Sequence, residues 1–269
     1  MKGSLKLKLE NLEKYLIDLK KVGIAFSGGV DSSFLLKFAG EILGENVKAY
    51  TINTVYIPDR DIETARNFTL KNNIRHSIIN IPLIDIIQHN PSDRCYFCKT
   101  FIFKKIREEA VKDGIEYLAE GTNIDDVNSH RPGLKVLEEL KIKSPLKETG
   151  FTKNDIRSAS KKLNLPTWNK PAYACLLTRL PYGTVVSDKE LKMIQESEDY
   201  IISLGFDGVR VRSHGNLARI EFLPEHLHKI LKNDILSKIT KKLKETGYQF
   251  VAIDTEGYKQ GSFDHTKQL

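Results

Sequence analysis

A serine- and glycine-rich turn directly after the first apolar run of the chain offers ligands for a phosphate. Its sequence, S-G-G-V-D-S-S, spans Ser27–Ser33 and precedes a predicted helix that begins at Asp31. Glycine lets a backbone approach a phosphate closely, and free N–H groups at the start of a helix point toward it. The hydroxyls of Ser32 and Ser33 add donors, while the carboxylate of Asp31 suits Mg²⁺. The segment therefore predicts a site for a magnesium-bound nucleotide, although it lacks the lysine of a Walker A loop.

A second polar segment, residues 120–126, reads E-G-T-N-I-D-D and follows another apolar run. Gly121 and Thr122 stand at its start, where a backbone can approach a nucleotide, and Asp126 closes it. A carboxylate at this place can hold Mg²⁺ against a pyrophosphate leaving group. The same composition also occurs in ordinary solvated turns, so the prediction depends on Asp31 lying nearby.

Three cysteines form the next group, and their spacing leaves several chemistries open. Cys95 and Cys98 stand in R-C-Y-F-C-K, and Cys175 stands in K-P-A-Y-A-C-L-L-T-R. An odd number excludes a complete intrachain disulfide framework, and a C-x-x-C pair can bind a metal or cluster, act as a redox pair, or simply be packed. A zinc site would need one histidine as a fourth ligand, from among His76, His89 and His130. A [4Fe–4S] cluster held by three thiolates would leave one iron open to an external ligand.

The first part of the chain must position these residues, and its pattern alternates strand and helix. We predict strands over 21–26, 47–54, 74–81 and 115–121, and helices over 31–43, 60–71, 97–113, 133–140 and 152–163. This alternation is typical of a doubly wound parallel α/β sheet, in which ligands bind at the carboxyl ends of the strands. The Ser27 turn, Thr51–Thr54 and 120–126 fall at such ends, so we expect them to converge on one site.

The pattern changes after the predicted sheet. Residues 166–183 are irregular and rich in proline, which predicts a functional linker. Beyond them we predict a helix over 188–204, strands over 208–214 and 217–223, a helix over 224–245 and a strand over 248–254. This order indicates a smaller C-terminal α+β domain. The predicted division is an ATP-binding domain at 1–165, an active-site linker at 166–183 and the C-terminal domain at 184–269.

Composition sets broad limits on the partners of the chain. The 269 residues are 40% hydrophobic and 29% charged, which is ordinary for a globular protein. A formal charge of +7 suits either a nucleic acid or an anionic small substrate. No apolar run approaches the roughly 20 residues of a membrane span, and the N-terminal segment has the pattern of an amphipathic helix rather than a secretory signal. We expect a cytoplasmic protein.

Four arginines are candidates for binding an anionic substrate: Arg131, Arg179, Arg210 and Arg212. The guanidinium fork matches phosphate and carboxylate groups in two-point contacts. Because Arg210 and Arg212 alternate along one predicted strand, they share a face, although an exposed polar strand face would show the same pattern. Weaker candidates are Glu221 and Asp254, as partners of the arginines or metal ligands, and Trp168, as a stacking platform.

Several of these motifs together resemble one enzyme family. They are SGGVDSS, RCYFCK, EGTNIDD, HRPG, SPL, KPAYACLLTRLPYG, RVRSHG and ARIEF. SGGVDSS is similar to the loop of the PP-loop ATP pyrophosphatases, and the set resembles the LarE family of sulfur transferases from about residue 20 to about residue 255. The resemblance implies that ATP is cleaved to AMP and pyrophosphate. It also implies that a carboxylate of pyridinium-3,5-biscarboxylic acid mononucleotide becomes a thiocarboxylate, in nickel-pincer nucleotide biosynthesis.

The resemblance also implies roles for individual residues. The ATP-binding set is Ser27, Gly28, Gly29, Asp31, Ser32, Ser33, Thr51, Gly121 and Thr122, with Mg²⁺ at Asp31 and Asp126. The arginines would bind the substrate, and Arg210 and Arg212 would meet its phosphate. Cys175 matches the cysteine common to two mechanisms of the family, while Cys95 and Cys98 match the additional pair of the type that binds a [4Fe–4S] cluster.

We therefore predict the cluster mechanism, with ATP, Mg²⁺ and a [4Fe–4S] cluster as cofactors and a sulfide source and a homo-oligomer as partners. Three alternatives stay open. Cys175 could give up its own sulfur, the enzyme could thiolate tRNA instead of a small nucleotide, or the chain could be a non-catalytic nucleotide-binding protein with structural zinc. Against tRNA, we find no aromatic and basic RNA-binding motif.

Overall fold

The computed structural model describes residues 2–127, 133–171, 174–231 and 234–259. Contacts within the chain divide it into two compact units. The first unit comprises Met1–Thr54, Asp59–Ile84 and Asp93–Lys170, and the second comprises Val55–Pro58, Asp85–Ser92 and Pro171–Leu269. The second unit thus takes in two short segments from the first half of the sequence. The predicted domain bounds at 165 and 183 stay a prediction. They state which parts of the chain fold independently, whereas the two units are defined by contacts alone.

A four-stranded parallel sheet lies at the centre of the first unit. Its strands are β1 (Val22–Ala25), β2 (Val47–Asn53), β3 (Arg75–Asn80) and β4 (Tyr117–Ala119), in the spatial order β3-β2-β1-β4. Val22 is in register with Val47 on one side and with Tyr117 on the other. The chain therefore moves outward from β1 to β3 and returns to the far side of β1. Ligands of such sheets bind where the strand order reverses, here beside the carboxyl ends of β1 and β4.

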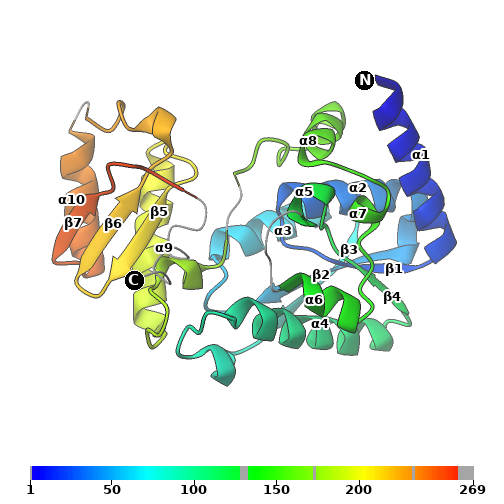
Figure 1. Cartoon of the computed structure of the whole chain (residues 1–269), viewed down its shortest axis with the longest axis horizontal. Helices are drawn as coiled ribbons and strands as arrows, with labels where there is room; N and C mark the ends of the chain where they lie inside the picture. Colours follow the sequence, from blue (N-terminus) through cyan, green and yellow to red (C-terminus); the bar gives the residue numbers. More distant parts are fainter. Residues whose placement is uncertain (1, 128–132, 172–173, 232–233, 260–269) are drawn as a thin grey trace. The chain divides into compact units, whose positions relative to one another are not determined.

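Helices cover both faces of this sheet, as a doubly wound fold requires (Figure 1). One side carries α1 (Lys2–Leu19), α2 (Val30–Leu43) and α8 (Lys153–Lys162), and the other carries α4 (Arg94–Lys112) and α6 (Gly133–Glu139). The remaining helices of this unit are α3 (Asp59–Lys71), α5 (Ile124–Val127), α7 (Pro145–Glu148) and the 3-10 turn η1 (Gly44–Asn46). The predicted α/β fold class is confirmed.

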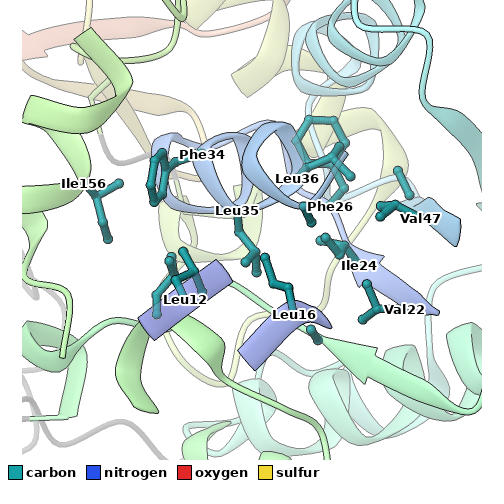
Figure 2. Packing of buried hydrophobic residues seen from close by; sticks show 14 of the residues in the cluster. Leu12, Leu16, Val22, Ile24, Phe26, Phe34, Leu35, Leu36, Val47 and Ile156 are labelled. Atoms are coloured by element: carbon teal, nitrogen blue, oxygen red, sulfur yellow. The ribbon is translucent and has the colours of Figure 1, made fainter. Parts of the chain in front are cut away.

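The apolar core of the first unit fixes the helix that begins at the phosphate loop. Leu12 and Leu16 of α1 pack against Leu35 of α2 and Ile24 of β1, and all four are fully buried (Figure 2). Burying such side chains stabilises the fold by about 1.5–3 kcal/mol each. The start of α2 is therefore held from two directions, by the sheet and by the N-terminal helix.

Helix α4 begins earlier than the sequence pattern predicts. The predicted start is residue 97, whereas the helix starts at Arg94, after Asp93 at its N-cap position. Cys95, which the prediction placed before the helix, and Cys98 consequently both lie within the first two turns of α4. Because residues three apart share a helix face, the two thiols are on the same side of α4.

The second unit has its own sheet and core. Strands β5 (Arg210–His214) and β6 (Leu217–Glu221) are antiparallel, and β7 (Phe250–Ile253) adds to β6 in parallel. Helices α9 (Asp188–Ser203) and α10 (Ile235–Thr246) pack with this sheet around an apolar cluster that includes Ile201 and Leu243. The predicted α+β arrangement is confirmed.

One predicted helix of this unit is wrong. The prediction ran from residue 224 to 245, but a short 3-10 turn occupies Pro224–His226 and α10 begins only at Ile235. Asp234, directly before α10, has φ +55. A right-handed helix cannot pass through that left-handed conformation, so α10 must start afresh there. As a separate finding, no helix among the described residues is long and apolar enough to cross a membrane.

Candidate active site

The phosphate loop joins the end of β1 to the start of α2. Gly28 has φ +68, a conformation that favours glycine, and Gly29 is the N-cap residue of α2. The hydroxyl oxygens of Ser27 and Ser32 lie 3.1 Å apart, and that of Ser32 donates to the carbonyl of Gly29 at 3.3 Å. The first amides of a helix have no acceptor within it. The loop can therefore present both N–H and hydroxyl donors to an anion.

The second polar segment lies directly against this loop. A Cβ atom built on Gly121 would stand 2.9 Å from the backbone nitrogen of Ser32 and 3.1 Å from the carbonyl carbon of Asp31. Side chains never approach a backbone this closely, so only glycine allows the end of β4 to meet the start of α2. The structure thus brings the two predicted nucleotide-binding segments together at the switch point of the sheet.

Asn123 links the two carboxylates that are predicted to hold magnesium. Its side-chain nitrogen lies 3.3 Å from Oδ1 of Asp31, and its backbone N–H donates to Oδ2 of Asp126 at 3.2 Å. Its side-chain oxygen accepts from the backbone N–H groups of Asp125 and Asp126. Asn123 is 1% exposed, so this arrangement is fixed in the interior. Oxygen ligands held this way suit a hard cation such as Mg²⁺.

Two lysines that the sequence analysis did not single out also reach this site. Lys153, the first residue of α8, pairs with Asp31, and its backbone N–H donates to Asp125 at 2.7 Å. Lys170 donates to the carbonyl of Gly28 at 3.2 Å. Lys153 lies outside the quoted motifs, and Lys170 opens the K-P-A-Y-A-C segment, whose prediction rested on the cysteine. Only the fold brings these two charges to the loop.

Two predicted ATP-binding residues have their hydroxyls engaged within the protein. Thr51 is 4% exposed, donates to the carbonyl of Phe26 at 2.7 Å and lies 2.8 Å from Nε2 of His76. The hydroxyl of Thr122 donates to the carboxylate of Glu120 at 2.7 Å. Both hydroxyls thus already make hydrogen bonds within the protein, and the two ATP-binding roles stay predictions.

Known proteins resemble this chain over the regions just described. The asparagine synthase family matches residues 10–102, which include the phosphate loop, Cys95 and Cys98. Pyridinium-3,5-bisthiocarboxylic acid mononucleotide synthase of Lactiplantibacillus plantarum is 33% identical over 98% of this chain and 96% of its own length. The chain belongs to the PP-loop ATP pyrophosphatase family. It is a LarE-like enzyme of that family.

Two further relatives have no assigned activity. An uncharacterised protein of Synechocystis is 35% identical over 97% of this chain and 98% of its own length. An uncharacterised protein of Methanocaldococcus jannaschii is 35% identical over 94% of this chain and 96% of its own length. Both units of the PP-loop enzyme therefore recur together, and the similarity is not confined to the nucleotide-binding sheet.

The cysteines of this PP-loop enzyme are divided between the two units. Cys95 and Cys98 belong to the first unit, where Cys95 is exposed and Cys98 is half-buried, and Cys175 belongs to the second unit and is half-buried. Within the described ranges, no three His, Cys, Asp or Glu side chains converge as a ready-made metal site. The donor set nevertheless has the right chemistry for iron, because all three cysteines are free and two of them share a helix face.

Arg179 is held inside the second unit rather than presented to solvent. It is fully buried, and its guanidinium donates to both carboxylate oxygens of Glu198 on α9, at 2.8 and 3.1 Å. Its Nη1 also donates to the carbonyls of Ala174 and Cys175, at 2.8 and 3.2 Å. The arginine thus holds the backbone of the cysteine itself, at the start of the 3-10 turn η3 (Leu176–Arg179). Its predicted role in substrate binding stays a prediction.

Arg212 holds the other end of that turn. Its Nη1 donates to the carbonyl of Thr178, and its Nη2 pairs with Glu221 at 2.7 Å. Glu221 also pairs with Arg219, which in turn pairs with Asp254. The weaker suggestion that Glu221 and Asp254 pair with arginines thus has a structural basis, although the partner of Asp254 is Arg219.

Two predicted substrate-binding arginines, Arg210 and Arg131, and the stacking candidate Trp168 remain to be placed. Arg210 is 2% exposed, donates to the carbonyls of Gly208 and Val209, and lies with its guanidinium carbon 4.7 Å from the ring centre of Tyr258. Arg131 lies outside the described residues. Trp168 is partly exposed, and the ammonium of Lys161 lies 4.7 Å from its ring centre.

Proposed function

We propose that this PP-loop enzyme is an ATP-dependent sulfur transferase that acts on pyridinium-3,5-biscarboxylic acid mononucleotide and converts a carboxylate to a thiocarboxylate, in the biosynthesis of a nickel-pincer nucleotide. The observation that carries the proposal is the similarity to the named synthase over nearly the whole of both chains. The convergence of Asp31, Gly121 and Asn123 beside the phosphate loop supports the ATP-dependent half of the reaction.

In the first half-reaction, an oxygen of the substrate carboxylate attacks the α-phosphorus of ATP. The bond to the β-phosphate breaks, and pyrophosphate leaves. The amides at the start of α2 and the hydroxyls of Ser27 and Ser32 would bind the leaving group. Asp31 and Asp126 would hold Mg²⁺, which would supply charge stabilisation of the pyrophosphate. Lys153, which pairs with Asp31, would then be available to the phosphates.

In the second half-reaction, a sulfur nucleophile attacks the acyl carbon, the bond from that carbon to the AMP oxygen breaks, and AMP leaves. Cys175 is the residue that we place at this step. Its backbone carbonyl is fixed by Arg179, which would keep the sulfur in a constant position. Glu198 would keep Arg179 in place through two hydrogen bonds.

Cys95, Cys98 and Cys175 together would hold a [4Fe–4S] cluster, which when bound would supply sulfide as the nucleophile. Three thiolates leave one iron without a protein ligand, which is the property that such a delivery needs. The alternative is that Cys175 gives up its own sulfur and that the other two cysteines have a different role.

The test is the iron and acid-labile sulfide content of the chain after strictly anaerobic purification, beside its absorption spectrum. About four irons and four sulfides per chain are expected, lost in Cys95→Ala, Cys98→Ala and Cys175→Ala. Thr100→Ala is the matched control on α4, because its hydroxyl donates only to the helix carbonyl of Tyr96; this variant should keep its iron.

Other outcomes would select the alternatives. The cluster would be contradicted if the chain held no iron after reconstitution and the mass of the peptide containing Cys175 fell by one sulfur during turnover. That result would support the mechanism in which Cys175 gives up its own sulfur. Zinc in place of iron, without pyrophosphate release on adding the substrate, would contradict the enzyme mechanism as a whole. Salt-sensitive binding of total tRNA tighter than about 1 μM would favour an RNA acceptor over the small nucleotide.

A further inference from the structure

Lys170 is the last residue of the first unit, and its ammonium lies against the backbone of the phosphate loop. It donates to the carbonyl oxygen of Gly28 at 3.2 Å and pairs with Oδ1 of Asp61, in the first turn of α3, at 3.0 Å. The side chains of Lys170 and Asp61 are only 18% and 15% exposed. Both contacts are therefore shielded from most of the solvent and are stronger than a surface ion pair.

The carbonyl that Lys170 holds belongs to a peptide that would otherwise rotate with little resistance. It joins Gly28 to Gly29, and Gly28 has φ +68; neither residue has a side chain to restrict the backbone. In a trans peptide the C=O of one residue and the N–H of the next point in opposite directions. Fixing the carbonyl of Gly28 therefore fixes the direction of the N–H of Gly29, the N-cap residue of α2, which donates to Oγ of Ser27 at 3.4 Å.

The backbone that carries Lys170 is itself held. Arg157 of α8 donates to the carbonyl of Lys170 at 3.2 Å and to the carbonyl of Trp168 at 3.0 Å. The ammonium of Lys161, one turn further along α8, lies over the ring of Trp168. Lys170 is thus anchored at its main chain and at its ammonium. A freely moving surface lysine would have neither attachment.

We infer that Lys170 is a positioning residue, which orients the Gly28–Gly29 peptide so that its N–H meets a bound phosphate. Its ammonium bonds to the carbonyl of Gly28 and to Asp61, so it acts through the loop. The positive charge beside the loop also favours an anion there. This inference depends on nucleotide binding by the PP-loop enzyme and not on the sulfur chemistry proposed above, so the two can fail separately.

The test compares Lys170→Met, Lys170→Arg and wild type by calorimetric titration with magnesium α,β-methylene-ATP and, separately, with adenosine. Lys170→Met should bind the ATP analogue about tenfold more weakly, because a hydrogen bond to a charged donor is lost, while adenosine binding is unchanged. Lys170→Arg keeps the charge and should stay within about threefold of wild type. Lys192→Met is the control for loss of one lysine, since Lys192 is 77% exposed on α9.

Asp61→Asn gives a second route if Lys170→Met does not fold, because it weakens the hold on the ammonium without removing it. It should weaken binding of the analogue by about threefold and leave adenosine unaffected. The inference is overturned if both variants bind the analogue as wild type does. It is also overturned if affinity for the analogue and for adenosine falls to the same degree, which would mean a general loss of structure.

Discussion

Arg179 and Glu198 form an ion pair whose two side chains have no contact with solvent. Glu198 also accepts the backbone N–H of Val211 on β5, at 3.1 Å. Removing one member of such a pair leaves the other charged and buried. We expect Arg179→Met to lower the free energy of unfolding by about 3–5 kcal/mol, measured by urea denaturation.

The double variant Arg179→Met with Glu198→Leu separates a positioning role from direct substrate binding. Since both charges are then gone, the double variant should be more stable than the single one. If Arg179→Met instead unfolds like wild type while its affinity for the mononucleotide falls, Arg179 contacts the substrate. That result would contradict the positioning role and support the role implied by the family resemblance.

His76 lies in the interior of the first unit, with one ring nitrogen 2.8 Å from the hydroxyl of Thr51 and the other 3.0 Å from that of Thr69. Burial, together with the nearby charges of Arg66 and Lys48, lowers the pKa of His76 from 6.5 to about 4. The unfolded chain therefore takes up a proton between pH 6.5 and pH 4 that the folded chain does not. Stability is lost as the pH falls through this window.

We expect the free energy of unfolding of wild type to fall between pH 7 and pH 4.5 by about 2 kcal/mol more than that of His76→Gln. Urea denaturation at the two pH values measures this difference. Glutamine keeps a polar group at the site but does not titrate. The variant therefore loses only the part of the pH dependence that the histidine causes. Equal losses in the two proteins would mean that carboxylates alone cause the pH dependence.

Sequence patterns located segments that combine several residue types suited to one chemistry, and missed single lysines. The Ser27–Ser33 turn and the 120–126 segment each combine glycine with polar groups after an apolar run, so both could be recognised and expected to meet. Lys153 lies outside the quoted motifs, and Lys170 opens the segment quoted around Cys175, where the prediction rested on the cysteine and not on the lysine. The burial of Arg179 was also not predictable, because its partner Glu198 lies on a helix that begins nine residues later and shows no special pattern.

At the scale of helices and strands, the site depends on how closely β4 approaches α2. Gly121→Ala places a methyl group 2.9 Å from the backbone nitrogen of Ser32, and neither backbone can move aside alone. We expect a loss of about 1–3 kcal/mol in stability and binding of α,β-methylene-ATP at least about tenfold weaker. Calorimetry and urea denaturation measure the two effects.

Gly40→Ala is the matched control for this variant, since Gly40 is on α2 itself. Its added Cβ would meet only the flexible end of Ile74, at 3.1 Å. Stability should change by less than about 1 kcal/mol and nucleotide binding should be unchanged. If both variants bind the nucleotide normally, the close approach of β4 to α2 is not needed for the site.

The sequence predicted the elements with regular periodicity well, and their ends less well. The strands of both sheets and helices α2, α3 and α9 follow from apolar spacing. The early start of α4 was missed because residues 94–96 have no apolar period. The predicted helix over 224–245 failed because amphipathic spacing continues across Asp234, whereas the backbone there has φ +55.

At the scale of the whole molecule, the second unit is built from three separate stretches of chain. Asn90 is fully buried and donates to the carbonyls of Leu177, Leu180 and Pro181 at 3.2, 3.1 and 2.9 Å. It thereby ties the Asp85–Ser92 segment to the turn that follows Cys175. We expect Asn90→Ala to reduce the free energy of unfolding by about 2–3 kcal/mol, because buried carbonyls lose their donor.

Asn90→Gly distinguishes the two causes of that loss. Asn90 has φ +45, which alanine tolerates poorly and glycine tolerates freely. The glycine variant loses the same hydrogen bonds without the strain, so it should be about 1 kcal/mol more stable than the alanine variant. An alanine variant as stable as wild type would mean that Asn90 does not secure the cysteine-bearing turn.

The second unit is built from stretches that are far apart in the sequence, and this affects the order in which the newly made chain folds. The backbone of Tyr56, a residue that is 1% exposed, accepts from the N–H of Leu176, and 120 residues of synthesis separate the two. At about 5–20 residues per second a ribosome takes roughly 6–24 s to produce that stretch. During this interval the sheet of the first unit can assemble, whereas Val55–Pro58 and Asp85–Ser92 must wait on the nascent chain for their partners. The cell would therefore possess the sheet of the first unit seconds before it possesses Cys175.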